Sequence, residues 1–204
     1  GANVGDCLYK DISGPNGEPD GVIDAYDQTV LGSGLPKVNF GLSTHMEYKG
    51  FDLNISTYGV LNYHVSDDIY NSLNSCYGYG NKEVGMLDAN RWSEDGSTYL
   101  SSVPRTYAAN NATLGWNDLF SSRKIQNAAY WKIANVELGY NFPDKWFGGY
   151  VSGVRLYVSA QNLYTFTGYH GYNVDYAGGT FTPGYNFCSF PSARTFMCGL
   201  HFTF

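Results

Sequence analysis

The chain has 204 residues and a formal net charge of −6, and charged residues make up 15% of it, against about 25% in an average protein. No apolar run approaches the roughly 18 residues of a membrane-spanning helix, and no basic stripe with interleaved aromatics indicates nucleic acid as a partner. A membrane barrel is not excluded, because barrel strands alternate and score weakly on hydropathy. Tyr occurs 19 times and Gly 25 times, which favours strands and turns over helices.

Residues 37–48, KVNFGLSTHMEY, alternate apolar and polar side chains, which is typical of a strand with two different faces. Residues 51–59, FDLNISTYG, repeat this alternation after the dipeptide Lys49–Gly50. A two-residue turn places the residues on either side of it opposite each other on one face. Here these residues are Tyr48 and Phe51, which both carry the apolar pattern, so we predict a β-hairpin.

Three further segments alternate in the same way, namely 130–142, 154–166 and 193–204. In the first of these, Trp131 and Ile133 have the opposite parity to the later apolar positions, which predicts a β-bulge near Ala134–Asn135. Residues 6–11, DCLYKD, are a candidate for the end of another strand.

The alternation assigns side chains to two faces. The apolar face, expected to point outward to lipid, holds Phe40, Leu42, Leu53, Ile55, Leu138, Leu156, Val158, Leu200 and Phe202. The polar face, expected to point inward, holds Asn39, Ser43, Asn54, Glu137, Tyr157 and His201, together with His45 and Glu47. Cys198 falls on the apolar face as a small apolar residue.

The connections are short at 49–50 and moderate at 143–153, but long at 11–35, 65–126 and 167–192. If the strands run up and down, the long connections share one end, as the extracellular loops of an outer-membrane barrel do. We predict an all-β fold, an antiparallel membrane β-barrel segment of five or six strands. The smallest bacterial barrels use about 8 strands, so these strands should complete a barrel of about 22, with the segments near 1–10 and 193–204 at its two outer edges.

Motifs in a fixed order resemble the SusC/RagA family of TonB-dependent outer-membrane transporters of Bacteroidetes. They are GDCLYKD, the segment 20–59, NRWSED (90–95), VPR (103–105), WKIANVELGYNFP, VRLYVSAQNLYTFTGYHGYN and FPSARTFMCGLHFTF. The resemblance implies that residues 1–204 are the C-terminal portion of a barrel domain, with the plug domain and TonB box outside this chain. It also implies import of oligosaccharides or peptides, with a SusD-like surface lipoprotein, the TonB complex and outer-membrane lipid as partners. The residues themselves contain no G-x-S-x-G, Walker or H-E-x-x-H pattern, so no enzymatic activity is expected.

The segment 16–27, NGEPDGVIDAYD, has the spacing of an EF-hand calcium loop. Its ligands would be Asn16, Glu18, Asp20, the carbonyl of Val22, Asp24 and Asp27. The other interpretation is a polar turn in which Asp side chains satisfy the backbone and Gly21 has positive φ. No flanking helix supports a calcium sensor. No cofactor is required, and a structural Ca²⁺ is the one candidate.

Two Tyr-rich segments, 76–85 and 168–179, could contact a sugar ring or a peptide, or pack on one another and on a lid. The candidate substrate-binding residues are Tyr77, Tyr79, Trp92, Tyr169, Tyr172 and Tyr185. Arg91 and Trp92 are alternatively expected to hold the long 65–126 connection in place, and Cys76 could pair with Cys188. Two other classes of protein stay open at this point, a soluble or surface carbohydrate-binding β-sandwich and a small complete outer-membrane barrel acting as adhesin or pore.

Overall fold

A computed structural model describes residues 3–76, 81–88, 91–93, 103–106, 116–147, 153–175, 179 and 181–203. The chain divides into two compact units, one formed by Gly1–Gly32 and Ser66–Ile125 and the other by Ser33–Val65 and Gln126–Phe204. None of the helices in the described ranges has the length and apolar character needed to cross a bilayer as a helix.

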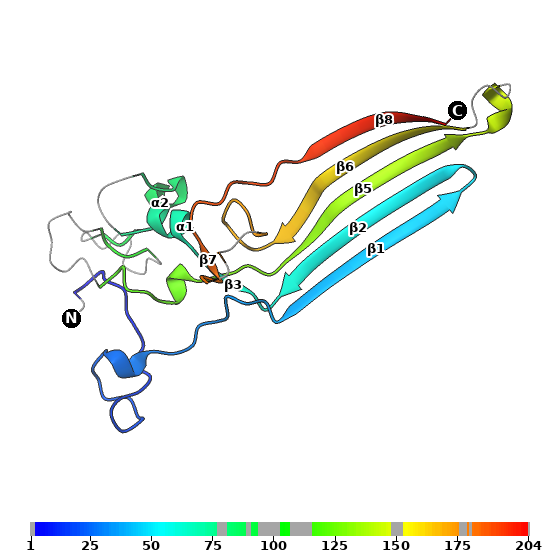
Figure 1. Cartoon of the computed structure of the whole chain (residues 1–204). Helices are drawn as coiled ribbons and strands as arrows, with labels where there is room; N and C mark the ends of the chain where they lie inside the picture. The colour runs from blue at the N-terminus through cyan, green and yellow to red at the C-terminus, as the bar shows by residue number, and fades with distance from the viewer. Residues whose placement is uncertain are drawn as a thin grey trace. The chain divides into compact units, whose positions relative to one another are not determined.

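The second unit is built on a five-stranded antiparallel sheet (Figure 1). Its order is β1 (Val38–Tyr48), β2 (Phe51–Leu61), β5 (Tyr130–Phe142), β6 (Gly153–Thr167) and β8 (Thr195–Thr203). A smaller sheet has the order β4 (Gln126–Asn127), β3 (His64–Asp67) and β7 (Tyr185–Asn186). The 3₁₀ helix η4 (Asp144–Phe147) lies in the connection from β5 to β6. These elements confirm the hairpin and the five alternating strands.

The β1–β2 turn and the β5–β6 connection lie at the same end of the sheet. Lys49 and Gly50 both have positive φ, at 49° and 87°, as a tight two-residue hairpin turn requires. The carbonyl of Gly50 accepts a hydrogen bond of 2.7 Å from the backbone N–H of Asn141, just before that connection. The long connections leave from the opposite strand ends, so the predicted sorting of short and long connections in this sheet is confirmed.

The first unit contains η1 (Ala25–Asp27), α1 (Asp68–Leu73), α2 (Val84–Asp88) and η3 (Ser122–Lys124). No strand forms in the described residues near the N-terminus, so the expected strand end at 6–11 and the expected outer edge near 1–10 are wrong. Side chains hold this segment instead. The Arg105 guanidinium pairs with Asp6 at 2.7 Å, and the Asn117 side chain accepts from the Cys7 N–H at 2.6 Å. Residues 6–11 have no neighbouring strand to pair with, so contacts with residues distant in sequence determine their conformation instead of their short alternating pattern.

The register aligns side chains into rows that cross the sheet from β1 to β8. One apolar row is Met46, Leu53, Leu138, Val158 and Cys198. The adjacent row on the other face is His45, Asn54, Glu137, Ser159 and Met197. Every residue assigned to a face from the sequence falls in a row of that face. Large side chains of the apolar rows are exposed, as Met46 is at 50% and Leu200 at 58%.

The predicted β-bulge in β5 is confirmed. Ser56 and Thr57 are consecutive in β2, but their partners in β5 are Asn135 and Ile133, which leaves Ala134 as the extra residue. An extra residue shifts the parity of a strand by one. The shift returns the apolar side chains before and after Ala134 to the same face.

A second irregularity lies beside the first, in β6. Asn162–Leu163 stands opposite the single residue Ala134, because the flanking pairs are Ile133 with Tyr164 and Asn135 with Gln161. Asn162 has a φ of 52°, in the left-handed region that Asn tolerates better than most residues. Its side-chain amide donates to the carbonyl of Ala193 at 2.9 Å, which fixes the bulge against the segment before β8.

The five-stranded sheet is open at both edges. In the part of the chain that is described, β1 pairs only with β2 and β8 only with β6. A complete barrel of these strands is therefore not formed, and a second large sheet that would cover the apolar face, as in a sandwich, is not formed by the described residues either. Both alternative architectures disagree with the structure, while a segment of a larger wall agrees with it.

Replacing Leu42 by Arg tests which face contacts lipid. Leu42 is an exposed apolar residue near the middle of β1. A charged side chain near the middle of the bilayer costs about 2–4 kcal/mol on the lipid face of a barrel, so Leu42→Arg should lower the stability of the membrane-inserted protein by about that much. Ser43→Arg is the matched control, since Ser43 is an exposed residue of the same strand on the polar face. Unfolding by denaturant in lipid vesicles measures both, and a larger loss for Ser43→Arg would reverse the face assignment.

Candidate functional site on the polar face of the sheet

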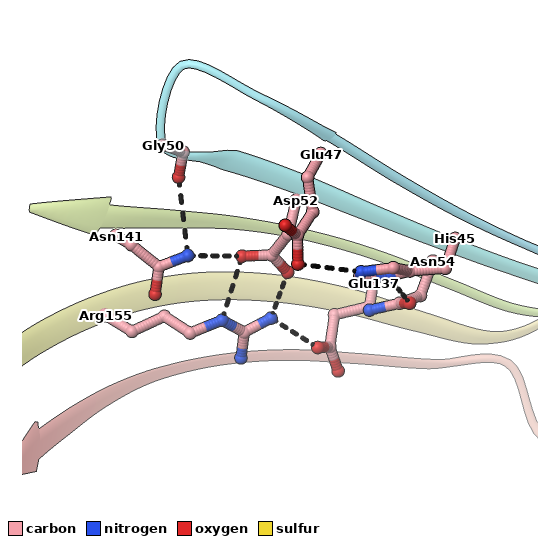
Figure 2. Close-up of polar contacts among 8 residues, drawn as sticks. All are labelled: His45, Glu47, Gly50, Asp52, Asn54, Glu137, Asn141 and Arg155. Carbon is pink, nitrogen blue, oxygen red and sulfur yellow. Dashed lines mark hydrogen bonds and ion pairs between the residues drawn. The ribbon is translucent and has the colours of Figure 1, made fainter.

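A network of charged and amide side chains covers the polar face near the short turns (Figure 2). Arg155 of β6 is at its centre. Its Nε and Nη2 donate to the two carboxylate oxygens of Asp52 in β2, at 3.1 and 2.5 Å. Nη2 also donates to Glu137 of β5 at 2.7 Å. One guanidinium thus joins three strands, and the two-pronged contact with Asp52 is the geometry in which Arg binds carboxylates most strongly.

A glycine makes room for this network. Gly139 of β5 stands opposite Asp52 in the sheet, and a Cβ there would lie 2.5 Å from the side chains of both Asp52 and Arg155. Gly199 of β8 plays the same part for the ring of Tyr157, which would lie 2.6 Å from an added Cβ. These glycines allow long side chains of neighbouring strands to lie flat over the sheet.

His45 of β1 extends the network to the edge strand. Its Nε2 lies 2.9 Å from a carboxylate oxygen of Glu47, and its Nδ1 lies 2.6 Å from the amide oxygen of Asn54. Glu47 is well exposed, in contrast to Asp52. Nothing in this set places a nucleophile beside a base, so the arrangement suits a contact surface and not catalysis.

The opposite end of the strands holds a pocket of about 320 Å³. Lys132 of β5 lines it and is almost fully buried, and its ammonium forms an ion pair with Asp175. Tyr164, Tyr172 and Arg194 are among the other lining residues.

The structure separates the candidate substrate-binding residues. Tyr77 and Tyr79 lie outside the described residues. Trp92 belongs to the first unit, where its ring packs against Gly5. The backbone N–H of Trp92 donates to the Val103 carbonyl at 3.0 Å. This agrees with a role in holding the long connection. The Arg91 guanidinium adds a bond to the Met86 carbonyl at 3.1 Å.

The other three tyrosines lie in the second unit. Tyr169 is 7% exposed, packs with Tyr63, Val65 and other core residues, and accepts a hydrogen bond from Asn186 at 2.8 Å. It therefore supports the pocket wall from within. Tyr172 is 63% exposed and lines the pocket, so its ring is available to a ligand. Tyr185 is exposed in β7 and is not among the pocket residues.

The acidic loop is arranged as a capped turn. The carboxylate of Asp27 accepts from the backbone N–H groups of Ile12 at 2.7 Å and Asp24 at 2.9 Å, while Asp24 accepts from Tyr26 at 2.8 Å. Asp20 accepts from the Val22 N–H at 2.9 Å. Among the described residues, no group of three or more acidic, His or Cys side chains is placed to hold a metal. The carboxylates in this conformation cap backbone N–H groups, and binding of Ca²⁺ stays a prediction.

The described cysteines are free thiols, so the disulfide that Cys76 and Cys188 could have formed is not present. Cys76 is buried in the first unit, and burial raises the pKa of its thiol. Cys198 is exposed in an apolar row of the sheet, as its position in the alternation predicted.

Comparison with known proteins finds similarity to TonB-dependent receptors along the whole chain. The chain is 30% identical over its full length to TonB-dependent receptor P3 of Formosa agariphila, and 26% identical over 97% of its length to TonB-dependent receptor SusC of Bacteroides thetaiotaomicron. It covers 19% of each of these relatives. No family model matches the chain.

Among solved structures, the RagAB peptide importer in the closed-closed state matches 94% of this chain with a TM-score of 0.74 and 24% identity. The match covers 20% of that importer chain, and it shows the shared fold. The chain matches a fragment of the SusC/RagA family of TonB-dependent outer-membrane proteins. The relatives are transport receptors and not enzymes, in agreement with the expectation from the sequence.

Sequence reasoning assigned the polar network to the correct face but did not find its centre. Asp52 and Arg155 were treated only as members of an alternating pattern, because 103 positions separate them in the chain. A signal was present in Asp52 and Glu137, two acidic residues on the inward face of strands that pair directly with each other. The strand order that makes these residues neighbours could not be read from alternation.

Removal of Asp52 should destabilise the sheet more than removal of Glu137. Asp52 accepts two hydrogen bonds from Arg155 and its side chain is 6% exposed, whereas Glu137 accepts one and is 26% exposed. Hydrogen bonds to charged groups contribute about 1.5–3 kcal/mol each, so we expect Asp52→Ala to lose the larger amount. Unfolding by denaturant in lipid measures the loss of stability of both variants. Glu47→Ala is the control, because it removes a carboxylate that is well exposed. Equal losses for Asp52→Ala and Glu47→Ala would contradict this ranking.

Acid should open the 11–27 loop. Hydrogen bonds from the N–H groups of Asp24 and Ile12 lower the pKa of the Asp27 carboxyl below its usual value. The native loop therefore gains from ionised Asp27 at any pH above the ordinary value of about 4, and this gain disappears as the pH falls through the lowered pKa. Hydrogen exchange at the amides of Ile12 and Ser13, referred to exchange in unstructured peptides, should lose protection only in that acid range. Constant protection down to full protonation would show that Asp27 does not hold the loop.

Proposed function

We propose that this chain forms part of the wall of an outer-membrane transporter that imports oligosaccharides or peptides with energy delivered through TonB. The observation that carries the proposal is the open five-stranded sheet, with exposed apolar rows on one face and a paired-charge network on the other. A lipid-facing band and a polar interior are what a membrane barrel needs. The similarity to TonB-dependent receptors over the full length of the chain supports this reading.

The proposed transporter needs strands from outside these 204 residues. Unpaired backbone N–H and C=O groups in hydrocarbon cost several kcal/mol each, so the free edges of β1 and β8 require neighbours. We place the chain in the C-terminal portion of a barrel of about 22 strands, with the plug elsewhere in the transporter. The relatives' much greater length is consistent with this arrangement.

The partners of the complete transporter follow from the same proposal. They are the remaining strands and the plug, the TonB complex, outer-membrane lipid and a SusD-like lipoprotein at the cell surface. Paired charges such as Asp52 and Arg155 present a polar wall to whatever fills the lumen, while the exposed ring of Tyr172 is a candidate contact for cargo. We assign no cofactor to this chain.

Uptake by living cells tests the proposal. Cells that express the complete transporter should take up fluorescent oligosaccharides or peptides too large for porins, and deletion of either the transporter or TonB should abolish that uptake. A small sugar that passes through porins serves as the control and should enter all three strains equally. Uptake that persists without TonB would indicate a passive pore, and absence of any transporter-dependent uptake would remove the assignment as an importer.

Co-purification addresses the lipoprotein separately. The complete transporter, extracted in mild detergent, should bring down a SusD-like lipoprotein in near-equal amount. A transporter that is active in uptake but purifies alone under all mild conditions would contradict the proposed partner while leaving import in place.

A further inference from the structure

In the described part of the chain, one stretch of β6 has no strand paired with it on the side where β8 lies. Pairing between these strands runs from Gly153 with Thr203 to Gln161 with Thr195 and stops there. β6 itself continues to Thr167, still paired with β5 on its other side. Among the described residues, no backbone hydrogen bond joins 162–167 to the segment that precedes β8. This leaves an edge of free N–H and C=O groups on β6, which we call the 162–167 edge.

The pocket of about 320 Å³ adjoins the 162–167 edge, which contributes Asn162, Tyr164, Thr165 and Thr167 to its lining. Ligand pockets usually measure about 300–1,000 Å³, so this one admits a short segment of a larger ligand. A free strand edge beside a pocket is the arrangement that binds an extended peptide as an added strand. The irregularity at Asn162 belongs to the same place, since the pairing of β6 with β8 ends at the preceding residue, Gln161.

The charges in the pocket favour an anion. Lys132 is neutralised by its ion pair with Asp175. Arg194 lines the pocket and, within the described ranges, takes part in none of the salt bridges or hydrogen bonds. The pocket therefore carries an excess of one positive charge in a chain whose net charge is −6. A guanidinium with no partner binds a carboxylate readily, through two parallel hydrogen bonds.

Polar groups in the pocket also suit a main chain. The hydroxyls of Thr165 and Ser192 also line the pocket, and a hydroxyl can both donate to and accept from a ligand main chain. Tyr172 adds an exposed aromatic ring. A peptide offers N–H and C=O groups in the regular repeat that a strand edge needs, whereas the hydroxyls of an oligosaccharide have no such repeat.

We propose that this pocket binds an extended oligopeptide that carries a carboxylate. The peptide adds to the 162–167 edge of β6, and its carboxylate pairs with Arg194. The inference rests on the proposed import function and specifies the cargo of the same barrel.

Binding to the complete transporter, purified with its lipoprotein, tests the proposal. The probes are a fluorescent acidic octapeptide, the same peptide with Gln and a C-terminal amide in place of its carboxylates, the acidic peptide N-methylated at alternate residues, and an oligouronide of similar length. We expect the acidic peptide to bind most tightly. The neutral and the N-methylated peptides should each bind at least about tenfold more weakly, since one loses the charged hydrogen bonds and the other the strand pairing.

Variants assign the effect to this pocket. Arg194→Gln should weaken the acidic peptide about tenfold or more while leaving the neutral peptide unchanged, and Arg194→Lys should restore part of the loss because the charge is kept. Lys145→Gln is the matched control, because it removes an exposed cation from η4 at the opposite end of the strands and should leave binding unaffected. Heat-modifiable migration on gels confirms that each variant is folded.

Three outcomes would overturn the inference. They are equal binding of the acidic peptide to Arg194→Gln and the unchanged protein, tighter binding of the oligouronide than of the peptide, and no effect of N-methylation. In each case TonB-dependent uptake of some oligomer would still support import. Absence of all uptake would instead remove the proposed function itself.

Discussion

The pairing of β2 with β5 is the constraint on which the rest of this structure depends. The whole 62–129 segment separates the two strands in the chain, yet their register must bring apolar side chains onto one face across every strand. A slip of one residue would place the entire apolar set on the wrong face. The bulge at Ala134 solves this by absorbing the change of parity inside β5, whereas the two residues Asn162–Leu163 opposite Ala134 leave the parity of β6 unchanged. The apolar rows and the polar rows on either side of the sheet follow from these two positions.

The two ends of the polar face differ in how their charges are used. Near the short turns, Arg155 is shared between two carboxylates, and Gly139 gives it space, so this part of the wall is rigid and internally satisfied. At the other end β8 stops before β6 does, and the pocket there holds the Arg194 guanidinium, which has no partner among the described residues. A transporter needs both properties. A satisfied wall does not retain a passing ligand, whereas unsatisfied groups at an entrance can recognise one.

Much of the sheet could be predicted from the sequence, because each strand carries its own alternation of apolar and polar residues. In addition, a two-residue turn allows only one pairing register for the two strands of a β-hairpin. The bulge near Ala134 was visible as a break in parity between Ile133 and Val136. The non-strand conformation of residues 6–11 could not be predicted, since Arg105 and Asn117, which bind them, lie about a hundred positions away in the chain. The acidic loop was ambiguous for a different reason: the same Asp residues that ligate calcium also cap turns, and only backbone geometry separates the two. The pocket depends on where β8 begins relative to the end of β6, and the alternation within either strand does not predict this.

Accessibility of spin labels along β5 tests the central claim most directly. Labels placed singly from Tyr130 to Phe142 in the complete protein, in lipid, report contact with apolar oxygen or with a water-soluble paramagnetic reagent. The account predicts oxygen maxima at Trp131 and Ile133 and then at Val136, Leu138 and Tyr140, with the alternation shifted by one residue at Ala134. An unbroken alternation through Asn135 and Glu137, or no alternation at all, would contradict a bulged wall strand between lipid and lumen.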